Sequence, residues 1–338
     1  MSRGAQVSVF ADGEIADKRV EPISHSPTPT EAPIFSAMFK PVVLAFVLLA
    51  ASVAGWAGDL PFGSAHVIVV DEASGEVLLS KDAATAAPIA SLTKLMTAMV
   101  VLDARQDLAE GIRIEPDDMD SLKHTRGGVP VGAVLPRETL LELALIASDN
   151  HAAAAVARSY PGGLAAFAEA TQQKIGALGL ANTTLVEPTG LSPANHASAM
   201  DMVKILQATQ AYPLIAQITS QRSHAVQVNG QTWGVRNTNG LVGKPGWTIL
   251  ASKTGFTNDA GRCLTMRLQA GGRTVSVVLI GAVASSARAL DALNIRRWLD
   301  GEPPVTRVAA QTVSRSRASR RARSSHIVRA SYTEPALR

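Results

Sequence analysis

Apolar and polar positions divide the chain into strand-like ends and a helical middle. The apolar runs at 65–71 and 76–82, joined by a Gly-bearing turn, predict a β-hairpin. Strand-like runs return in the last third of the chain, at 223–230, 248–255, 262–269 and 273–283. The pair Gly271-Gly272 marks the turn between the last two of these runs.

The pattern between these ends is helical. Apolar residues at helical spacing predict a helix from about Ser91 to Asp103. Further helices are predicted at 136–147, 150–160, 164–179, 198–212 and 285–299. Residues 107–132 are polar and glycine-rich, which predicts a loop with a short strand at 112–114. We expect an α/β domain whose antiparallel sheet combines the N-terminal hairpin with the C-terminal strands, with a helical subdomain between.

The first 57 residues are assigned to a leader outside this domain. Residues 1–37 are polar and patternless, and an apolar run then follows Met38 and Lys40 and ends in small residues near Ala57. This arrangement is typical of a cleaved export signal. An uncleaved membrane anchor is the alternative, although the run is shorter than the ~20 residues that span a bilayer comfortably. The sequence therefore predicts a periplasmic protein whose folded part covers residues 58–304.

Residues 305–338 form an arginine- and serine-rich tail that changes the meaning of the net charge. The formal charge of the 338 residues is +4, but the tail holds eight arginines and one acid, and the remaining 24 basic and 27 acidic residues give −3. Such a tail is predicted to be disordered. Electrostatic contact of the tail with anionic cell-wall polymer or membrane is a further hypothesis. Nucleic acid is not expected as a partner of an exported protein.

The remaining cysteine and histidine chemistry is sparse. The one cysteine, Cys263, excludes an internal disulfide and is predicted to be a small buried apolar residue. The seven histidines form no H-E-x-x-H pair, and no serine lies in a G-x-S-x-G elbow. Neither a zinc peptidase nor an α/β-hydrolase is supported, and no metal or cofactor is predicted. We expect His151 to be a solvated first-turn residue.

The stretch "ASLTKLMTAMV" (90–100) carries the strongest chemical signal. Ser91 and Lys94 stand at i and i+3 and therefore share one helix face. Apolar surroundings disfavour the ammonium, and a neutral amine beside a hydroxyl is a general base beside a nucleophile. A helix that begins near Ser91 also offers backbone N–H groups for a developing oxyanion. The alternative for so short a pattern is that Ser91 caps the helix and Lys94 reaches water.

Two later stretches favour the catalytic interpretation. Ser148-Asp149-Asn150 lies at a junction of two helical runs, where a hydroxyl and an amide can project into a cleft. Lys253-Thr254-Gly255 lies on a predicted strand, and Gly255 would let a bound chain approach the backbone closely. S-x-x-K, S-D-N and K-T-G in this order resemble the motifs of the penicillin-recognising serine enzymes.

The resemblance extends to "YPGGLAAF", "VEPTGLS", "RNTNGLV" and "KTGFTNDAGRCLTMR" and covers roughly residues 66–299. The chain resembles the low-molecular-mass penicillin-binding proteins, and within them the short murein D-alanyl-D-alanine endopeptidase branch. This resemblance implies a penicillin-binding transpeptidase-like (β-lactamase-like) fold. It also implies peptidoglycan stem peptides as substrate and β-lactams as covalent inhibitors.

The resemblance also implies a role for each motif residue. Ser91 would form the acyl-ester, Lys94 would accept its proton, and Ser148 would relay a proton to the departing amine. Asn150 would orient Lys94 and hold the substrate backbone. Lys253 and Thr254 would bind a substrate carboxylate, and the charge of Lys253 would help to keep Lys94 neutral. The backbone N–H groups of Ser91 and Phe256 would form the oxyanion hole.

Several activities stay open. Larger carboxypeptidases of this family carry a second, β-rich domain and an amphipathic helix, whereas only a Ser/Arg tail follows Pro304, which favours the endopeptidase. D-Ala-D-Ala carboxypeptidase activity is the alternative. A β-lactamase would need a deacylating glutamate, and the pair Glu187-Pro188 is followed by Thr189-Gly190-Leu191 as in the peptidases. A non-catalytic penicillin-binding sensor is a further alternative.

Overall fold

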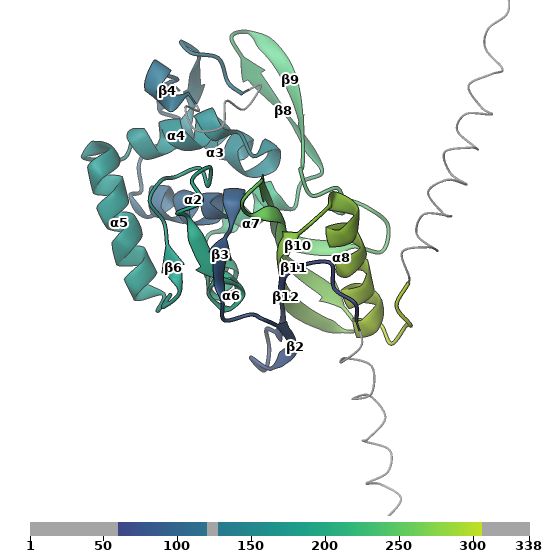
Figure 1. Cartoon of the computed structure of the whole chain (residues 1–338). Coiled ribbons are helices and arrows are strands. Elements are labelled where there is room, and N and C mark those ends of the chain that lie inside the picture. The colour runs from purple at the N-terminus through teal and green to yellow at the C-terminus, as the bar shows by residue number, and fades with distance from the viewer. Residues whose placement is uncertain (1–59, 120–127, 306–338) are drawn as a thin grey trace, which may run out of the picture. The chain divides into compact units, whose positions relative to one another are not determined.

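The computed structural model of the protein describes residues 60–119 and 128–305 (Figure 1). The predicted leader, part of the predicted loop and nearly all of the predicted tail lie outside the described residues. The strands are β1 (His66–Asp71), β2 (Val77–Lys81), β3 (Ala86–Pro88), β4 (Gly111–Arg113), β5 (Val134–Pro136), β6 (Thr183–Thr184), β7 (His196–Ser198), β8 (Ser223–Val228), β9 (Gln231–Arg236), β10 (Thr248–Thr257), β11 (Gly261–Ala270) and β12 (Arg273–Ala282). The α-helices are α2 (Thr93–Asp103), α3 (Arg137–Glu142), α4 (Asn150–Arg158), α5 (Gly163–Ala177), α6 (Ala199–Ala208), α7 (Pro213–Thr219) and α8 (Ser285–Leu299).

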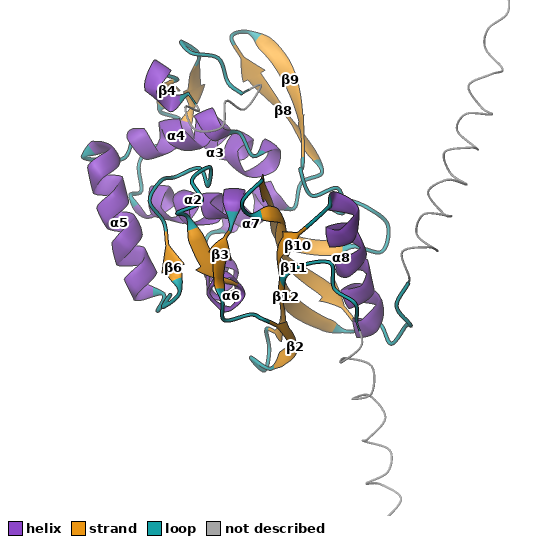
Figure 2. Cartoon of the chain, viewed as in Figure 1, coloured by secondary structure: helices purple, strands orange, loops and turns teal. Residues whose placement is uncertain are grey.

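A five-stranded antiparallel sheet in the order β10-β11-β12-β1-β2 confirms the predicted α/β architecture (Figure 2). The first strand of the domain pairs with the last, and His66 lies opposite Ile280. Side chains alternate across β1, so Val67 and Val69 join the core beneath α8, whereas Ile68 and Val70 join the core shared with the helices. Both faces of the sheet are therefore buried, which explains the continuous apolar runs of its strands.

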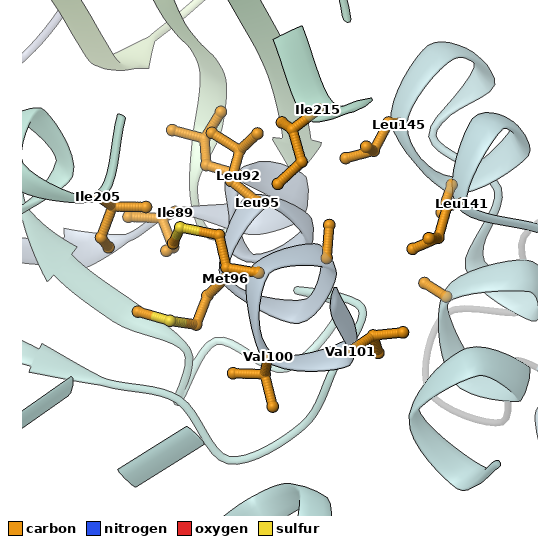
Figure 3. Packing of buried hydrophobic residues seen from close by; sticks show 14 of the residues in the cluster. Ile89, Leu92, Leu95, Met96, Val100, Val101, Leu141, Leu145, Ile205 and Ile215 are labelled. Atoms are coloured by element: carbon orange, nitrogen blue, oxygen red, sulfur yellow. The ribbon is translucent and has the colours of Figure 1, made fainter. Parts of the chain in front are cut away.

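The helix α2 lies at the centre of the helical part and is buried from Thr93 to Val101. Figure 3 shows its side chains Leu95, Met96, Val100 and Val101 among residues of the surrounding elements. The 3₁₀-helix η2 (Ala90–Leu92) precedes α2 and packs against β10. The predicted helix from Ser91 is confirmed, and its first turn is tightened to 3₁₀ geometry. Because it is packed on all sides, α2 is a rigid support for the groups on its first turn.

Several elements depart from the sequence expectation. The strand β8 pairs with β9 in a separate hairpin instead of joining the main sheet, and β9 was not predicted. The predicted helix at 136–147 continues beyond α3 as a π-helix, η4 (Leu143–Ala147). A π-helical turn of this kind is rare and is frequent at functional sites. It leads directly into Ser148.

The sulfur of Cys263 is buried as predicted and points to the carbonyl oxygen of Ala260 at 3.4 Å. Burial raises the pKa of this thiol to about 11. The thiolate is therefore scarce near neutral pH, and Cys263 is not a candidate nucleophile.

Candidate active site

The amine of Lys94 has a contact set that suits a general base. The side chain is 1% exposed, and Nζ donates to Oδ1 of Asn150 and to the carbonyl oxygen of Thr189, both at 2.7 Å. Nζ also lies 2.9 Å from Oγ of Ser91. A neutral amine can donate two hydrogen bonds, and these two oxygens accept them. Its lone pair can then face the serine hydroxyl, which is the direction from which a base takes a proton.

Ser148 and Asn150 take their positions from an unusual local backbone. Ser148 follows η4 with φ 63° and ψ 32°, a left-handed conformation that is uncommon for a residue with a side chain. Asp149 caps α4 by accepting from the backbone N–H of Ala152 at 2.9 Å. Asn150 is therefore the first residue of α4, beside Lys94. The middle residue of the S-D-N motif thus has a structural role that the motif itself did not reveal.

The K-T-G segment lies on β10, which is an edge strand of the main sheet. Nζ of Lys253 donates to Oγ of Ser148 at 2.8 Å, and the side chain is 1% exposed. Burial, with the charges of Lys94 and Arg288, holds the pKa of Lys253 well below its ordinary value. Oγ1 of Thr254 donates to Oγ1 of Thr238 at 2.7 Å. Burial and the neighbouring positive charges therefore disfavour the ammonium form of Lys253.

Two glycines hold the backbone beside the nucleophile. Ala90 has φ 48°, so the residue before Ser91 is also left-handed. A Cβ atom on Gly190 would lie 2.0 Å from the carbonyl oxygen of Ala90. A Cβ atom on Gly255 would lie 2.8 Å from the carbonyl oxygen of Ile89 and 3.1 Å from the nitrogen of Ser91. The turn at residues 89–91, which holds the nucleophile Ser91 and is called the nucleophile turn below, is thus in direct contact with the backbone of Gly190 and of Gly255.

Glu187 fixes the loop that carries the Thr189 carbonyl. Its carboxylate accepts from the backbone N–H groups of Thr189 and Gly190, both at 2.7 Å. Oγ1 of Thr97, on α2, donates to the carbonyl oxygen of Pro188 at 2.7 Å. The carboxylate is therefore occupied within its own loop, and its contacts serve to aim the Thr189 carbonyl at Lys94.

The structure brings all eight predicted site residues together at one cleft of about 610 Å³. Lys94 and Lys253 lie beneath its wall, hydrogen-bonded to the serines, and the other six residues line it. The lining also includes residues to which the sequence analysis assigned no role at the site, namely Gly128, Ala147, Asp149, Leu191, Thr238, Arg262, Ser285 and Arg288. Within the described residues, no cluster of potential metal ligands is present.

The prediction for His151 is wrong. The side chain is 4% exposed, and its Nδ1 lies 2.9 Å from the carbonyl oxygen of Val129. A Cβ atom on Gly128 would lie 2.6 Å from the same ring. The segment at Gly128 and Val129 therefore covers this first-turn residue and excludes it from solvent.

Lys253 offers a pH test of the site. Because its pKa is lowered from 10.5 in the folded state, the unfolded chain binds this proton more readily. The free energy of unfolding should therefore rise with pH in the window that ends near 10.5. Lys253→Met should remove this rise. Urea titrations from about pH 7 to about pH 10 should show the wild type gaining stability relative to the variant. Parallel curves would contradict a lowered pKa.

Comparisons with known proteins agree with this geometry. The family model described as D-alanyl-D-alanine carboxypeptidase matches residues 57–284. A D-alanyl-D-alanine endopeptidase of Pseudomonas aeruginosa is 42% identical over 244 residues, covering 72% of this chain and 78% of the relative. One of Escherichia coli is 40% identical, covering 70% and 77%. The crystal structure of the Streptomyces K15 DD-transpeptidase shares the fold, with a TM-score of 0.66 at 24% identity, covering 71% of this chain and 98% of that one.

Proposed function

The chain belongs to the D-alanyl-D-alanine carboxypeptidase family, and from this premise we propose that it is a serine-type endopeptidase that cleaves D-alanyl cross-links of peptidoglycan. The proposal depends on the contacts of the Lys94 amine. Its two N–H groups donate to Asn150 and to the Thr189 carbonyl, and its lone pair can face the hydroxyl of Ser91. This geometry suits formation of an acyl-ester.

Acylation begins when the hydroxyl of Ser91 gives its proton to Lys94 and its Oγ attacks the D-alanyl carbonyl carbon. The ammonium formed on Lys94 is stabilised by Asn150 and by the Thr189 carbonyl, which already accept from it. The backbone N–H groups of Ser91 and Phe256 would receive the oxyanion. Losing one such donor typically costs about 3–4 kcal/mol of transition-state stabilisation.

When the peptide bond breaks, the departing amine takes up the proton that Lys94 accepted from Ser91, passed on through Ser148, and Lys94 becomes neutral again. Ser148 is placed for this relay, because its Oγ already accepts from Lys253 and lines the same cleft as Ser91. Water then attacks the ester, with Lys94 again as the base, and releases the D-alanyl product. The serine hydroxyl is regenerated in this second step.

A substrate carboxylate would bind at Lys253 and Thr254, with Arg288 lining the same part of the cleft. Entry of the carboxylate would favour the charged form of Lys253, because it offsets the repulsion from Lys94 and Arg288. The substrate backbone can run along β10, which is the last strand in the sheet order of the described residues and has no strand paired to its outer edge there. Carboxylate charge and strand pairing would together set the register of the scissile bond.

The relatives favour cross-link cleavage over trimming of terminal D-alanine. The P. aeruginosa and E. coli relatives are both described as D-alanyl-D-alanine endopeptidases. A relative at 28% identity, from Bacillus subtilis, is described as a D-alanyl-D-alanine carboxypeptidase. Because both reactions share one acyl-enzyme, carboxypeptidase activity is the second candidate.

The test uses the purified full-length chain. We expect covalent labelling by a fluorescent penicillin and conversion of cross-linked muropeptide dimers to monomers. Release of free D-alanine from pentapeptides should be slower than dimer cleavage. Labelling without hydrolysis of either substrate would favour a penicillin-binding sensor, and no labelling would contradict the acyl-enzyme. Faster release of D-alanine than of monomers would favour the carboxypeptidase.

The proposal includes export to the periplasm, because the substrate lies there, and β-lactams as covalent inhibitors. Among the described residues no helix is long and apolar enough to cross a membrane. Contact of the arginine-rich tail with anionic wall polymer or membrane is part of the same proposal and is supported by its eight arginines.

A further inference from the structure

One end of the cleft carries a stacked arginine that the mechanism above does not use. Phe256 and Arg262 lie opposite each other on β10 and β11. The guanidinium carbon of Arg262 lies 3.4 Å from the ring centroid of Phe256, and Phe256 is 47% exposed. Both residues line the cleft, directly beyond Thr254 and Gly255. Because the ring covers one face of the guanidinium, the N–H groups of Arg262 stay available for hydrogen bonds in the guanidinium plane.

Among the described residues, no acid forms an ion pair with the arginines at this end of the cleft. Arg288 donates to the carbonyl oxygen of Cys263 at 2.9 Å, and both burial and the charge of Arg262 lower its pKa. Arg262 forms no ion pair with another residue in the described ranges. Among the described residues that line the cleft, the one acid is Asp149, whose carboxylate accepts from the backbone N–H groups of Ala152 and Val129. Two guanidiniums therefore face the cleft with room for an anion.

We propose that Arg262, held by Phe256, forms a second carboxylate subsite that binds the leaving peptide of a cross-link. This inference rests on the proposed peptidase function. A terminal D-alanine leaves with one carboxylate, which Lys253, Thr254 and Arg288 can hold. When a cross-link is cleaved, the leaving group is a whole stem peptide. This peptide carries an additional carboxylate at its own C-terminal end. Only this larger leaving group can reach both positive positions at once.

The choice of arginine and phenylalanine fits this role. A guanidinium binds a carboxylate through two parallel N–H bonds and remains charged throughout the working pH range. Stacking on the aromatic ring restricts its side-chain rotation, so less conformational entropy is lost when the peptide binds. Arg262 is therefore a specificity-determining residue that separates cross-linked from terminal substrates.

The test compares three reactions in Arg262→Gln, Arg262→Lys and the wild type, all as full-length chains. In Arg262→Gln, kcat/KM for cross-linked dimers should fall about tenfold, as expected for one charge-assisted contact near the surface. Penicillin acylation and D-alanine release from pentapeptide should change less than about twofold, since neither uses the second subsite. The kcat/KM of Arg262→Lys for cross-linked dimers should lie between the values of the wild type and of Arg262→Gln. Arg273→Gln, on the turn at the opposite end of the same hairpin, is the matched control.

Amidation of the leaving peptide's terminal carboxylate provides a second arm. It should slow dimer cleavage by the wild type about tenfold and have no further effect in Arg262→Gln. Equal losses on dimer and pentapeptide, no loss on the dimer, or an amidation effect that persists in the variant would each overturn the subsite. A wild type that penicillin does not label would overturn the peptidase proposal itself. The two failures are therefore distinguishable.

Discussion

Replacing Ser91 by alanine should abolish penicillin labelling and lower kcat for dimer cleavage by about 10⁴-fold or more, the scale seen when a covalent nucleophile is removed. Lys94→Ala should cause a loss of similar size, because it removes the amine that lies 2.9 Å from the hydroxyl of Ser91 and accepts its proton. The double variant should be no worse than either single variant, since the two groups act as one unit. Labelling kinetics and muropeptide digestion measure both effects.

The fold should survive the Ser91 change. Ser91 is partly exposed and its side chain makes a small contribution to the core, so the melting temperature should stay close to that of the wild type. Lys94→Ala leaves the Thr189 carbonyl and Asn150 without their donor, which costs about 1–3 kcal/mol. Persistent labelling in Ser91→Ala would show that another residue carries the acyl group. Additive losses in the double variant would contradict a joint role.

Gly190→Ala should destabilise the domain by at least about 3 kcal/mol and suppress acylation, the scale of the severe single substitutions. The added Cβ would lie 2.0 Å from the carbonyl oxygen of Ala90 and 2.8 Å from the nitrogen of Ser91. Both are backbone atoms and cannot rotate away. The turn that holds the nucleophile must therefore move, and the oxyanion donor of Ser91 moves with it.

Gly179→Ala is the control that distinguishes the effect of the Gly190 contact from the effect of backbone strain alone. Gly179 also has positive φ, at 60°, but a Cβ atom there would meet nothing within 4 Å. Its substitution should cost about 1–2 kcal/mol from the left-handed conformation and leave acylation intact. Urea denaturation and penicillin labelling of both variants provide the comparison. Equal effects in the two variants would show that the Gly190 contact is not important.

Apolar periodicity predicted the main sheet and α2 because these elements bury continuous runs or regular faces. It missed α7, Pro213–Thr219, because a seven-residue helix is too short to show a period. It missed β9 because that strand pairs only with β8 and leaves most of its residues exposed. The solvated position expected for His151 was wrong because Gly128 and Val129 cover it, which depends on tertiary packing.

Short motifs located the side chains of the candidate site but not its backbone. S-x-x-K, S-D-N and K-T-G each retain a recognisable spacing, and the structure places their residues at one cleft. The carbonyl of Thr189 has no sequence signature, because any residue could supply it. The contact between Gly190 and Ala90 joins segments that are distant in the chain. Arg262 and Arg288 likewise become distinctive only after β11 and α8 are placed.

The pairing of β1 with β12 determines when the enzyme can become active. During synthesis, β1 emerges early but finds its partner strand only after residues 273–282 have followed. The nucleophile turn likewise gains its contact with Gly255 only when β10 has docked. An incomplete chain therefore contains the reactive serine without the surroundings that activate it. Hydrolytic capacity arises only at the end of folding, when β10 and β12 have docked.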